Sequence, residues 1–146
     1  MDRCHVHGMH VAIETSGCVS QEIFMKVISK VDFAFIDIKH MDSSKHVIGT
    51  GIGNETILSN IRTLKSSNWT GRMILRQPVI GNFNDSFENA DMNIKFMKEI
   101  GQYEINLLPF HRFGATKWER LGMQYPYLNG GDVSEEYLIN LQKRYL

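Results

Sequence analysis

FAFIDIK, residues 33–39, is a nearly continuous apolar run of the length of one strand, and it ends at a lysine. Similar runs lie on both sides of it along the chain, at Val11–Ile13, Met73–Ile80 and Ile105–Leu108. Runs of this kind are typical of parallel strands that are covered on both faces. The sequence therefore predicts four buried parallel strands.

Amphipathic helical patterns separate these runs. Apolar residues recur at helical spacing after Ser20, after Asn54 and from Phe87 to Met97, where Gly101 is placed to end the helix, and a last helix is expected from about Ser134. The resulting order, β-α-β-α-β-α-β followed by a loop-rich segment and a helix, predicts an α/β fold with right-handed crossovers. Four such strands fit either a small open sheet or an arc of a (β/α) barrel.

Size and composition limit the classes of function. The chain has 146 residues and is expected to form one domain, residues 1–146. Its formal net charge of zero argues against a nucleic-acid surface, and no apolar run approaches the roughly 20 residues of a membrane span. The N-terminus has no signal-peptide pattern and only two cysteines are present, so the expected compartment is the cytosol.

Polar residues gather where the predicted strands end. They are Glu14 and Thr15 after the first, Asp37 and Lys39 after the second, Arg76 in the third and His111 after the fourth. Ligands of open α/β sheets and barrels bind at this carboxyl edge, so the set could hold a small zwitterion or a cation. Simpler interpretations remain: an ion pair of Asp37 with Lys39, a turn at residues 14–17, a structural His111 and a structural salt bridge of Arg76.

Other polar motifs carry less weight. Cys4, His5, His7 and His10 do not follow a standard zinc spacing, and this segment is interpreted as the end of a helix that leads into the first strand. His40 and His46 are expected to be exposed in the loop after the second strand. Residues 49–54, GTGIGN, lack the features of a phosphate loop and are interpreted as a flexible entry to the next helix.

Five segments in order resemble one known family. They are HVAIETSG, VDFAFIDIKHMD, NETILSNIRTL, ILRQPVIGNFND and INLLPFHRFGATKWERLG, and they span about residues 8–122. This pattern is similar to the radical S-adenosylmethionine (SAM) activating enzymes of glycyl radical enzymes, of which the pyruvate formate-lyase activating enzyme is the best known. The implied fold is a partial (β/α)6 barrel, of which this chain would supply strands three to six.

The resemblance implies a role for each polar residue. Lys39, His111 and Arg76 match positions at the SAM site, although Arg76 could instead face the substrate. Glu14, Thr15 and Asp37 match residues that bind a monovalent cation beside the SAM carboxylate, and Glu14 stands where the family often has aspartate. In the family, a reduced 4Fe–4S cluster and SAM generate a radical that takes hydrogen from a glycine of the partner enzyme, so the cofactors perform the difficult chemistry.

Two family motifs are absent from this sequence: the CxxxCxxC loop that holds the cluster, and the GGE-type segment that meets the SAM amine. We therefore expect no iron–sulfur ligands and no catalytic residue in this chain, which would be the C-terminal portion of an activase and inactive alone. The first strand would then be a free sheet edge through which the chain is expected to self-associate.

Several interpretations of function remain open. The chain is either a portion of an activase or a non-catalytic remnant or binding module that retains the partner-facing edge and part of the SAM site. An unrelated (β/α) barrel enzyme, such as a metal-dependent aldolase, is a weaker alternative. The partner is a glycyl radical enzyme under the first interpretation: pyruvate formate-lyase, a diol or glycerol dehydratase, a choline lyase or an arylacetate decarboxylase.

Overall fold

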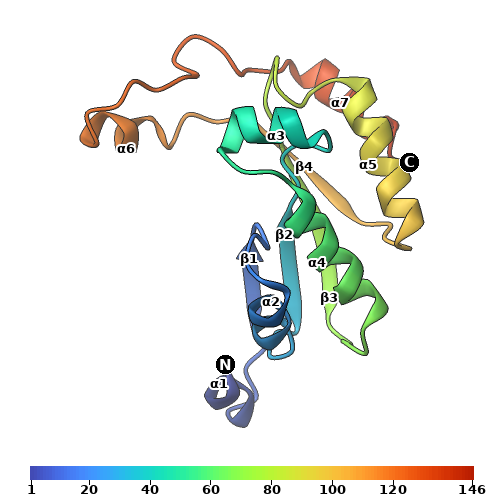
Figure 1. Cartoon of the computed structure of the whole chain (residues 1–146). Helices are drawn as coiled ribbons and strands as arrows, with labels where there is room; N and C mark the ends of the chain where they lie inside the picture. The colour runs from blue at the N-terminus through green and yellow to red at the C-terminus, as the bar shows by residue number, and fades with distance from the viewer.

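In the computed structural model, which describes residues 1–146, four strands form one parallel sheet whose order in space follows the order in sequence (Figure 1). The strands are β1 (Ala12–Thr15), β2 (Phe33–Asp37), β3 (Arg72–Val79) and β4 (Ile105–Pro109). The register pairs Glu14 with Phe35 and Asp37 with Arg76. The predicted parallel α/β arrangement is confirmed, and each strand lies within two residues of its predicted bounds.

Seven helices accompany the sheet. They are α1 (Asp2–Val6), α2 (Gln21–Ile28), α3 (Ser43–Thr50), α4 (Glu55–Ser66), α5 (Phe87–Glu99), α6 (Ala115–Arg120) and α7 (Glu135–Lys143). The side chains of Ser20 and Ser134 accept hydrogen bonds from the main chain of the first turns of α2 and α7. Gly101 follows α5 with a φ of 63°, as expected for a residue just past a helix end.

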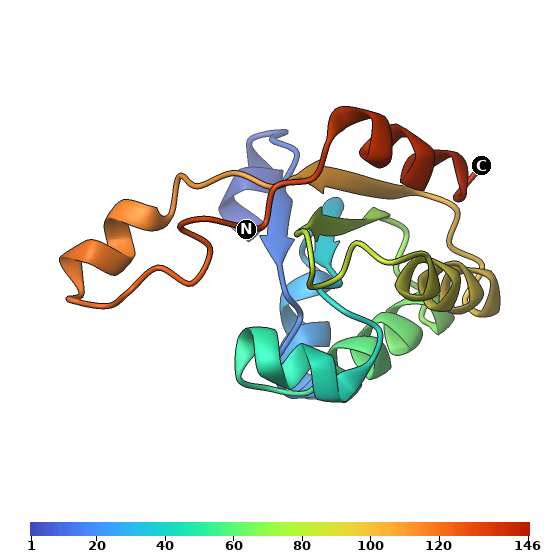
Figure 2. The same cartoon turned by 90° about the horizontal axis from the view of Figure 1, so that it is seen from above.

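Helices cover only one face of the sheet. Ala34, Ile36 and Leu75 are fully buried in one cluster with apolar residues of α2, α4 and α5, and α4 and α5 lie on the same side of the strands in Figure 2. The expectation that the strands are covered on both faces is wrong, because the helices pack against one face only. An apolar run does not distinguish a helix-covered face from the inner face of an arc.

The other face, which we call the open face, carries Phe33 and Phe35 with their rings edge to face at 4.8 Å. The guanidinium of Arg72 lies 5.6 Å from the ring centre of Phe33, and that of Arg76 lies 5.3 Å from the ring centre of Phe35. These cation–π contacts cover aromatic surface that no helix covers.

The segment after β2 forms a helix that the sequence did not predict. Helix α3 begins after Asp42, whose side chain accepts a hydrogen bond from the main-chain N–H of Lys45, and it ends at Gly51 with a φ of 81°. His40 and His46 are 1% and 2% exposed, so the prediction that both are exposed is wrong. Each ring makes main-chain hydrogen bonds: His46 Nδ1 lies 2.6 Å from Ile52 O, and His40 Nδ1 lies 2.9 Å from Asp42 N.

The segment between β4 and α7 projects away from the sheet and carries α6, as both views show (Figures 1 and 2). Arg112 fastens its base, because the guanidinium donates to the main-chain oxygens of Tyr127 (3.1 Å) and Gly130 (2.9 Å) and pairs with Asp132. Among the helices, none has the length and apolar character needed to cross a membrane.

Candidate functional site

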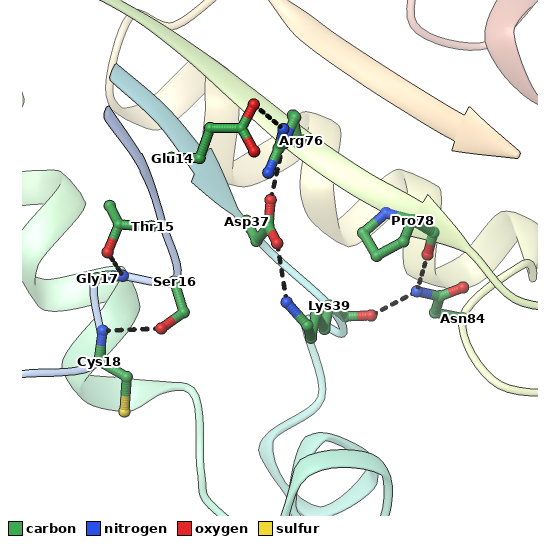
Figure 3. A network of polar contacts seen from close by, with 10 residues as sticks. All are labelled: Glu14, Thr15, Ser16, Gly17, Cys18, Asp37, Lys39, Arg76, Pro78 and Asn84. Atoms are coloured by element: carbon green, nitrogen blue, oxygen red, sulfur yellow. Dashed lines mark hydrogen bonds and ion pairs between the residues drawn. The ribbon is translucent and has the colours of Figure 1, made fainter. Parts of the chain in front are cut away.

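The charged side chains at the carboxyl ends of β1 to β3 form one network, drawn in Figure 3. Arg76 lies at its centre: Nε donates to Asp37 Oδ1 at 2.9 Å, and Nη1 lies 2.9 Å from Glu14 Oε1. Lys39 Nζ donates to the second oxygen of Asp37, also at 2.9 Å. The structure therefore brings together Glu14, Asp37, Lys39 and Arg76, and we call this set the charged rim.

The charged rim is partly shielded from solvent. The side chains of Arg76 and Asp37 are 16% and 19% exposed, whereas that of Glu14 is 64% exposed. Burial by itself would lower the pKa of Arg76, but the hydrogen bonds to Asp37 and Glu14 prevail and raise it. Arg76 therefore remains a cation, and the network of two carboxylates and two cations has no net charge.

Thr15 takes no part in the charged rim. Its hydroxyl accepts a hydrogen bond from Gly17 N at 3.0 Å, inside the turn that follows β1. Gly17 has a φ of +66°, a conformation that favours glycine. The simpler interpretation of residues 14–17 as a turn therefore holds for Thr15. It does not hold for Glu14, whose carboxylate pairs with Arg76.

His111 lies on the exposed loop between β4 and α6. Its ring stacks on Phe113, with the ring centres 4.3 Å apart and the planes inclined by 28°. It makes no hydrogen bond or ion pair with the charged rim. Thus His111 shares only the edge of the sheet with the other predicted site residues, because it follows β4, the strand next to β3.

A pocket of about 310 Å³ opens beside the charged rim. Asp37 and Lys39 line it together with residues that follow β1, residues of α3, the loop after α3 and the start of α4; these are Ser16, Cys18, His46, Thr50, Ile52 and Ile57. A larger hollow of about 630 Å³ lies along β4, but no residue of the charged rim lines it. The smaller pocket is the better candidate because two residues of the charged rim, Asp37 and Lys39, line it.

Buried asparagines hold the loops of this edge, and the sequence analysis missed them. Asn54, Asn60 and Asn84 are 1–3% exposed, and each donates its side-chain amide to two main-chain carbonyls. Asn60 holds Gly17 O (2.8 Å) and Val19 O (2.9 Å) of the turn after β1. One signal was available in the sequence: Asn60 interrupts the apolar stripe of α4 at a position that faces the core.

The thiols of this chain do not fit an iron–sulfur cluster. Cys4 lies in α1, before β1 begins, and Cys18 follows the end of β1, so that strand separates them. No group of three or more His, Cys, Asp or Glu side chains is placed to hold a metal ion. The nearby His5 ring instead pairs with Asp32, at 2.8 Å.

The fold places the chain in a defined structural class. It superposes on a domain of the pyruvate-formate lyase-activating enzyme from Bacteroides vulgatus with a TM-score of 0.77 and 26% identity, covering 98% of this chain and 79% of that domain. It also resembles a radical SAM methyltransferase from Sphaerobacter thermophilus, with a TM-score of 0.69 at 13% identity, over 95% of this chain and 39% of that one. The four-stranded arc therefore has the fold of a partial radical SAM barrel.

Sequence comparison narrows the class. The chain is 53% identical over all 146 residues to the 4-hydroxyphenylacetate decarboxylase activating enzyme of Clostridium scatologenes, 47% of which it covers. It is 38% identical over 139 residues to the indoleacetate decarboxylase activating enzyme of Tractidigestivibacter scatoligenes, covering 95% of this chain and 44% of that enzyme. No model of a known protein family matches. The homologues of this chain are thus glycyl-radical-enzyme activating enzymes, and it spans about half their length.

Proposed function

We propose that residues 1–146 form one domain that supplies strands three to six of the barrel of a glycyl-radical-enzyme activating enzyme, as its C-terminal portion. The observation that carries this proposal is the charged rim at the carboxyl ends of β1 to β3, in a chain whose homologues are such enzymes. Charged groups at this edge are suitably placed for a ligand of a parallel sheet.

SAM suits the donor set of this edge. We propose that Lys39 and Arg76 offset the SAM carboxylate, since an ammonium and a guanidinium are the side chains that pair with carboxylates most readily. His111 would approach the ligand from the loop after β4. When bound next to a reduced iron–sulfur cluster, SAM supplies a radical that can abstract hydrogen.

A monovalent cation at Glu14, Thr15 and Asp37 fits less directly. Both oxygens of Asp37 and one of Glu14 are engaged by Arg76 or Lys39, and the Thr15 hydroxyl is engaged by Gly17. A cation would therefore have to share these carboxylates with Arg76. We therefore propose that the cation binds together with SAM. The SAM carboxylate would pair with Lys39 and Arg76 and so release the carboxylates of Asp37 and Glu14 for the cation.

The absence of a cluster site in this chain favours a second interpretation for the chain on its own. It would bind SAM or the partner as a module and would not cleave SAM, because neither cysteine has a second thiol nearby. The free thiols also support a reducing compartment, the cytosol.

We propose a glycyl radical enzyme as the partner, and a decarboxylase of arylacetates as its kind. The chain is 53–54% identical to activating enzymes of 4-hydroxyphenylacetate decarboxylases, but 36% identical to the choline trimethylamine-lyase activating enzyme of Oleidesulfovibrio alaskensis. This difference supports a decarboxylase over a choline lyase as the partner.

Calorimetric titration of the chain with SAM tests the proposed site. Lys39→Met should weaken binding about tenfold, the equivalent of about 1.4 kcal/mol, because it removes an ammonium from the pocket. Lys143→Met is the matched control, since Lys143 is exposed at the end of α7. Equal affinities of both variants would contradict the assignment of Lys39.

Anaerobic iron–sulfur reconstitution separates the two interpretations of the chain. We expect no cluster absorbance and no 5′-deoxyadenosine from the chain alone. A stable cluster with SAM cleavage would show that Cys4, Cys18 and a histidine build a site that this structure does not show.

Electron paramagnetic resonance tests the proposed partner. 4-Hydroxyphenylacetate decarboxylase treated with the full-length activase should show a glycyl radical, and a silent spectrum would contradict the proposal of this decarboxylase as the partner.

A further inference from the structure

Asn84 uses every polar atom of its side chain. The amide nitrogen donates to Lys39 O and to Pro78 O, both at 2.7 Å, and the amide oxygen accepts from Ile80 N, also at 2.7 Å. The residue is 1% exposed, so water cannot replace these bonds without a change in structure. Figure 3 shows Asn84 between the ends of β2 and β3.

These bonds lie where the main chain of Lys39 has left the sheet. Ile38 N donates to Arg76 O at 2.8 Å, and the paired register of β2 and β3 ends at Asp37 and Arg76. One residue later, Asn84 bridges the carbonyls of Lys39 and Pro78. Its side chain therefore continues the connection between the two strands beyond the last pair of the ladder.

Further amides fix Asn84 and the segment after Lys39. The main-chain oxygen of Asn84 accepts from Gln77 Nε2 and from Asn89 Nδ2, both at 3.0 Å. Asn89 Oδ1 accepts from Met41 N at 2.9 Å, while Asn54 donates to the oxygens of His40 and Met41 at 2.9 and 2.8 Å. The loop that begins at Lys39 is thus held from α5 on one side and from the start of α4 on the other.

We propose that Asn84 is a positioning residue for the charged rim: it anchors the main chain of Lys39 so that the ammonium stays on Asp37 and faces the pocket. This inference rests on the proposed function for its link to SAM, but not for its link to Lys39. A lysine side chain has many rotamers and loses considerable entropy when ordered, so the position of its main chain limits where its ammonium can reach.

Asn84→Asp tests this with little change in shape. The aspartate keeps an oxygen for Ile80 N but gives up both N–H donors and places a carboxylate against two carbonyls. The matched control is Gln102→Glu, because Gln102 is 5% exposed and its Nε2 also donates to two carbonyls, Met73 O and Glu104 O, at 3.0 Å each. That clamp lies at the amino ends of β3 and β4, away from the charged rim.

The first measurement is the acetylation rate of Lys39, mapped by mass spectrometry on the folded chain. The other lysines are internal references, except Lys65, whose ammonium contacts Gln102. Asn84→Asp should raise the rate at Lys39 about fivefold, the ratio expected for about 1 kcal/mol of lost anchoring. Gln102→Glu should reduce the stability of the fold by a similar free energy, about 1 kcal/mol, and should leave the acetylation rate of Lys39 unchanged. Should Asn84→Asp not fold, Asn84→Ser, which retains one donor, takes its place.

The second measurement is the affinity for SAM. Asn84→Asp should weaken it about fivefold and Gln102→Glu should not. An unchanged Lys39 rate in folded Asn84→Asp, or an equal increase in Gln102→Glu, would overturn the proposal. If the unaltered chain does not bind SAM, the proposed SAM site fails for this chain, whereas the comparison of Lys39 rates still decides the role of Asn84.

Discussion

Arg76 and Asp37 are joined twice, once through the sheet and once through their side chains. Their Cα atoms are partners in the parallel register of β2 and β3, and Arg76 Nε donates to Asp37 Oδ1 at 2.9 Å. Residues paired in register point to the same face, so the guanidinium reaches the carboxylate across one strand spacing. The ion pair is therefore part of the open face, and the fold of two strands is enough to place it.

Removal of this cation should cost more than removal of a surface cation. Arg76→Met leaves Glu14 without its partner and Asp37 with Lys39 alone, in a partly buried setting. We expect a loss of about 1–3 kcal/mol in the free energy of unfolding, between the values of exposed and buried ion pairs. Urea unfolding followed by circular dichroism measures it.

The control for this prediction is Lys30→Met, which breaks the ion pair with Asp2. Those side chains are 45% and 70% exposed, so the expected loss is below about 1 kcal/mol. Similar shifts of the urea midpoint in the two variants would show that Arg76 contributes no more to stability than a surface residue.

The strands and most helices were predictable because local sequence determines them. The alternation of apolar runs with amphipathic stripes fixes β1 to β4, α2, α4, α5 and α7, and the ends of parallel strands bring Glu14, Asp37 and Arg76 to one edge. Thr15 ends β1 as expected, but the direction of its hydroxyl depends on the turn at Gly17, which hydrophobic periodicity does not encode.

Features that depend on tertiary partners were not predictable. His40 and His46 appear as loop polar residues in the sequence, and their burial depends on carbonyl and amide groups that only the folded chain supplies. Similarly, Asn84 is an ordinary loop residue in the string IGNFND until the carbonyls of Lys39 and Pro78 are seen beside it. An asparagine in a turn has many uses, and sequence alone does not choose among them.

His40 predicts a loss of stability in mild acid. Burial lowers its pKa from the ordinary value of 6.5, with Lys45 adding to the effect. The ring nitrogen Nδ1 accepts from Asp42 N, which requires the neutral form. Below about pH 6.5 the unfolded chain therefore binds a proton more readily than the folded chain does. The free energy of unfolding should consequently decrease as the pH is lowered below this value, before the pH range in which carboxylates take up protons is reached.

Urea unfolding between pH 7 and about 5 checks this sign. His40→Gln should flatten the decline, whereas His7→Gln, at an exposed residue just past α1, should leave it in place. Parallel curves for the unaltered chain and His40→Gln would assign the decline to other groups.

A side chain at Gly17 should destabilise the fold. With a φ of +66°, alanine would be strained, and its Cβ would lie 3.3 Å from the ring of Phe24 and 3.7 Å from Ile36. We expect Gly17→Ala to reduce stability by about 1–2 kcal/mol. Gly114→Ala is the comparison, because Gly114 has a φ of −78° and no atom lies within 4 Å of the place that an alanine methyl would take. Thermal unfolding of both variants gives the result, and equal midpoints would refute the strain argument.

The free edge of β1 predicts self-association of this chain. Val11 O accepts from Asp32 N and Phe33 N, so Val11 directs its carbonyl toward β2. Successive residues of a strand direct their main-chain N–H and C=O groups to opposite sides. The N–H and C=O of Ala12 therefore point to the free side of β1, where another strand can pair with them. Sedimentation velocity should therefore show oligomers that increase with concentration.

Ala12→Pro removes an edge N–H and should weaken association about tenfold. The bonds between β1 and β2 should survive, because they use the alternate residues. Ala12→Val keeps the N–H and favours a strand, so it should associate at least as strongly as the unaltered chain. A monomer at every concentration would exclude the edge of β1 as a contact. Oligomers that persist in Ala12→Pro would place the contact elsewhere. The next residues to alter would then be Phe113 and Leu121, which are apolar and exposed on the projecting segment.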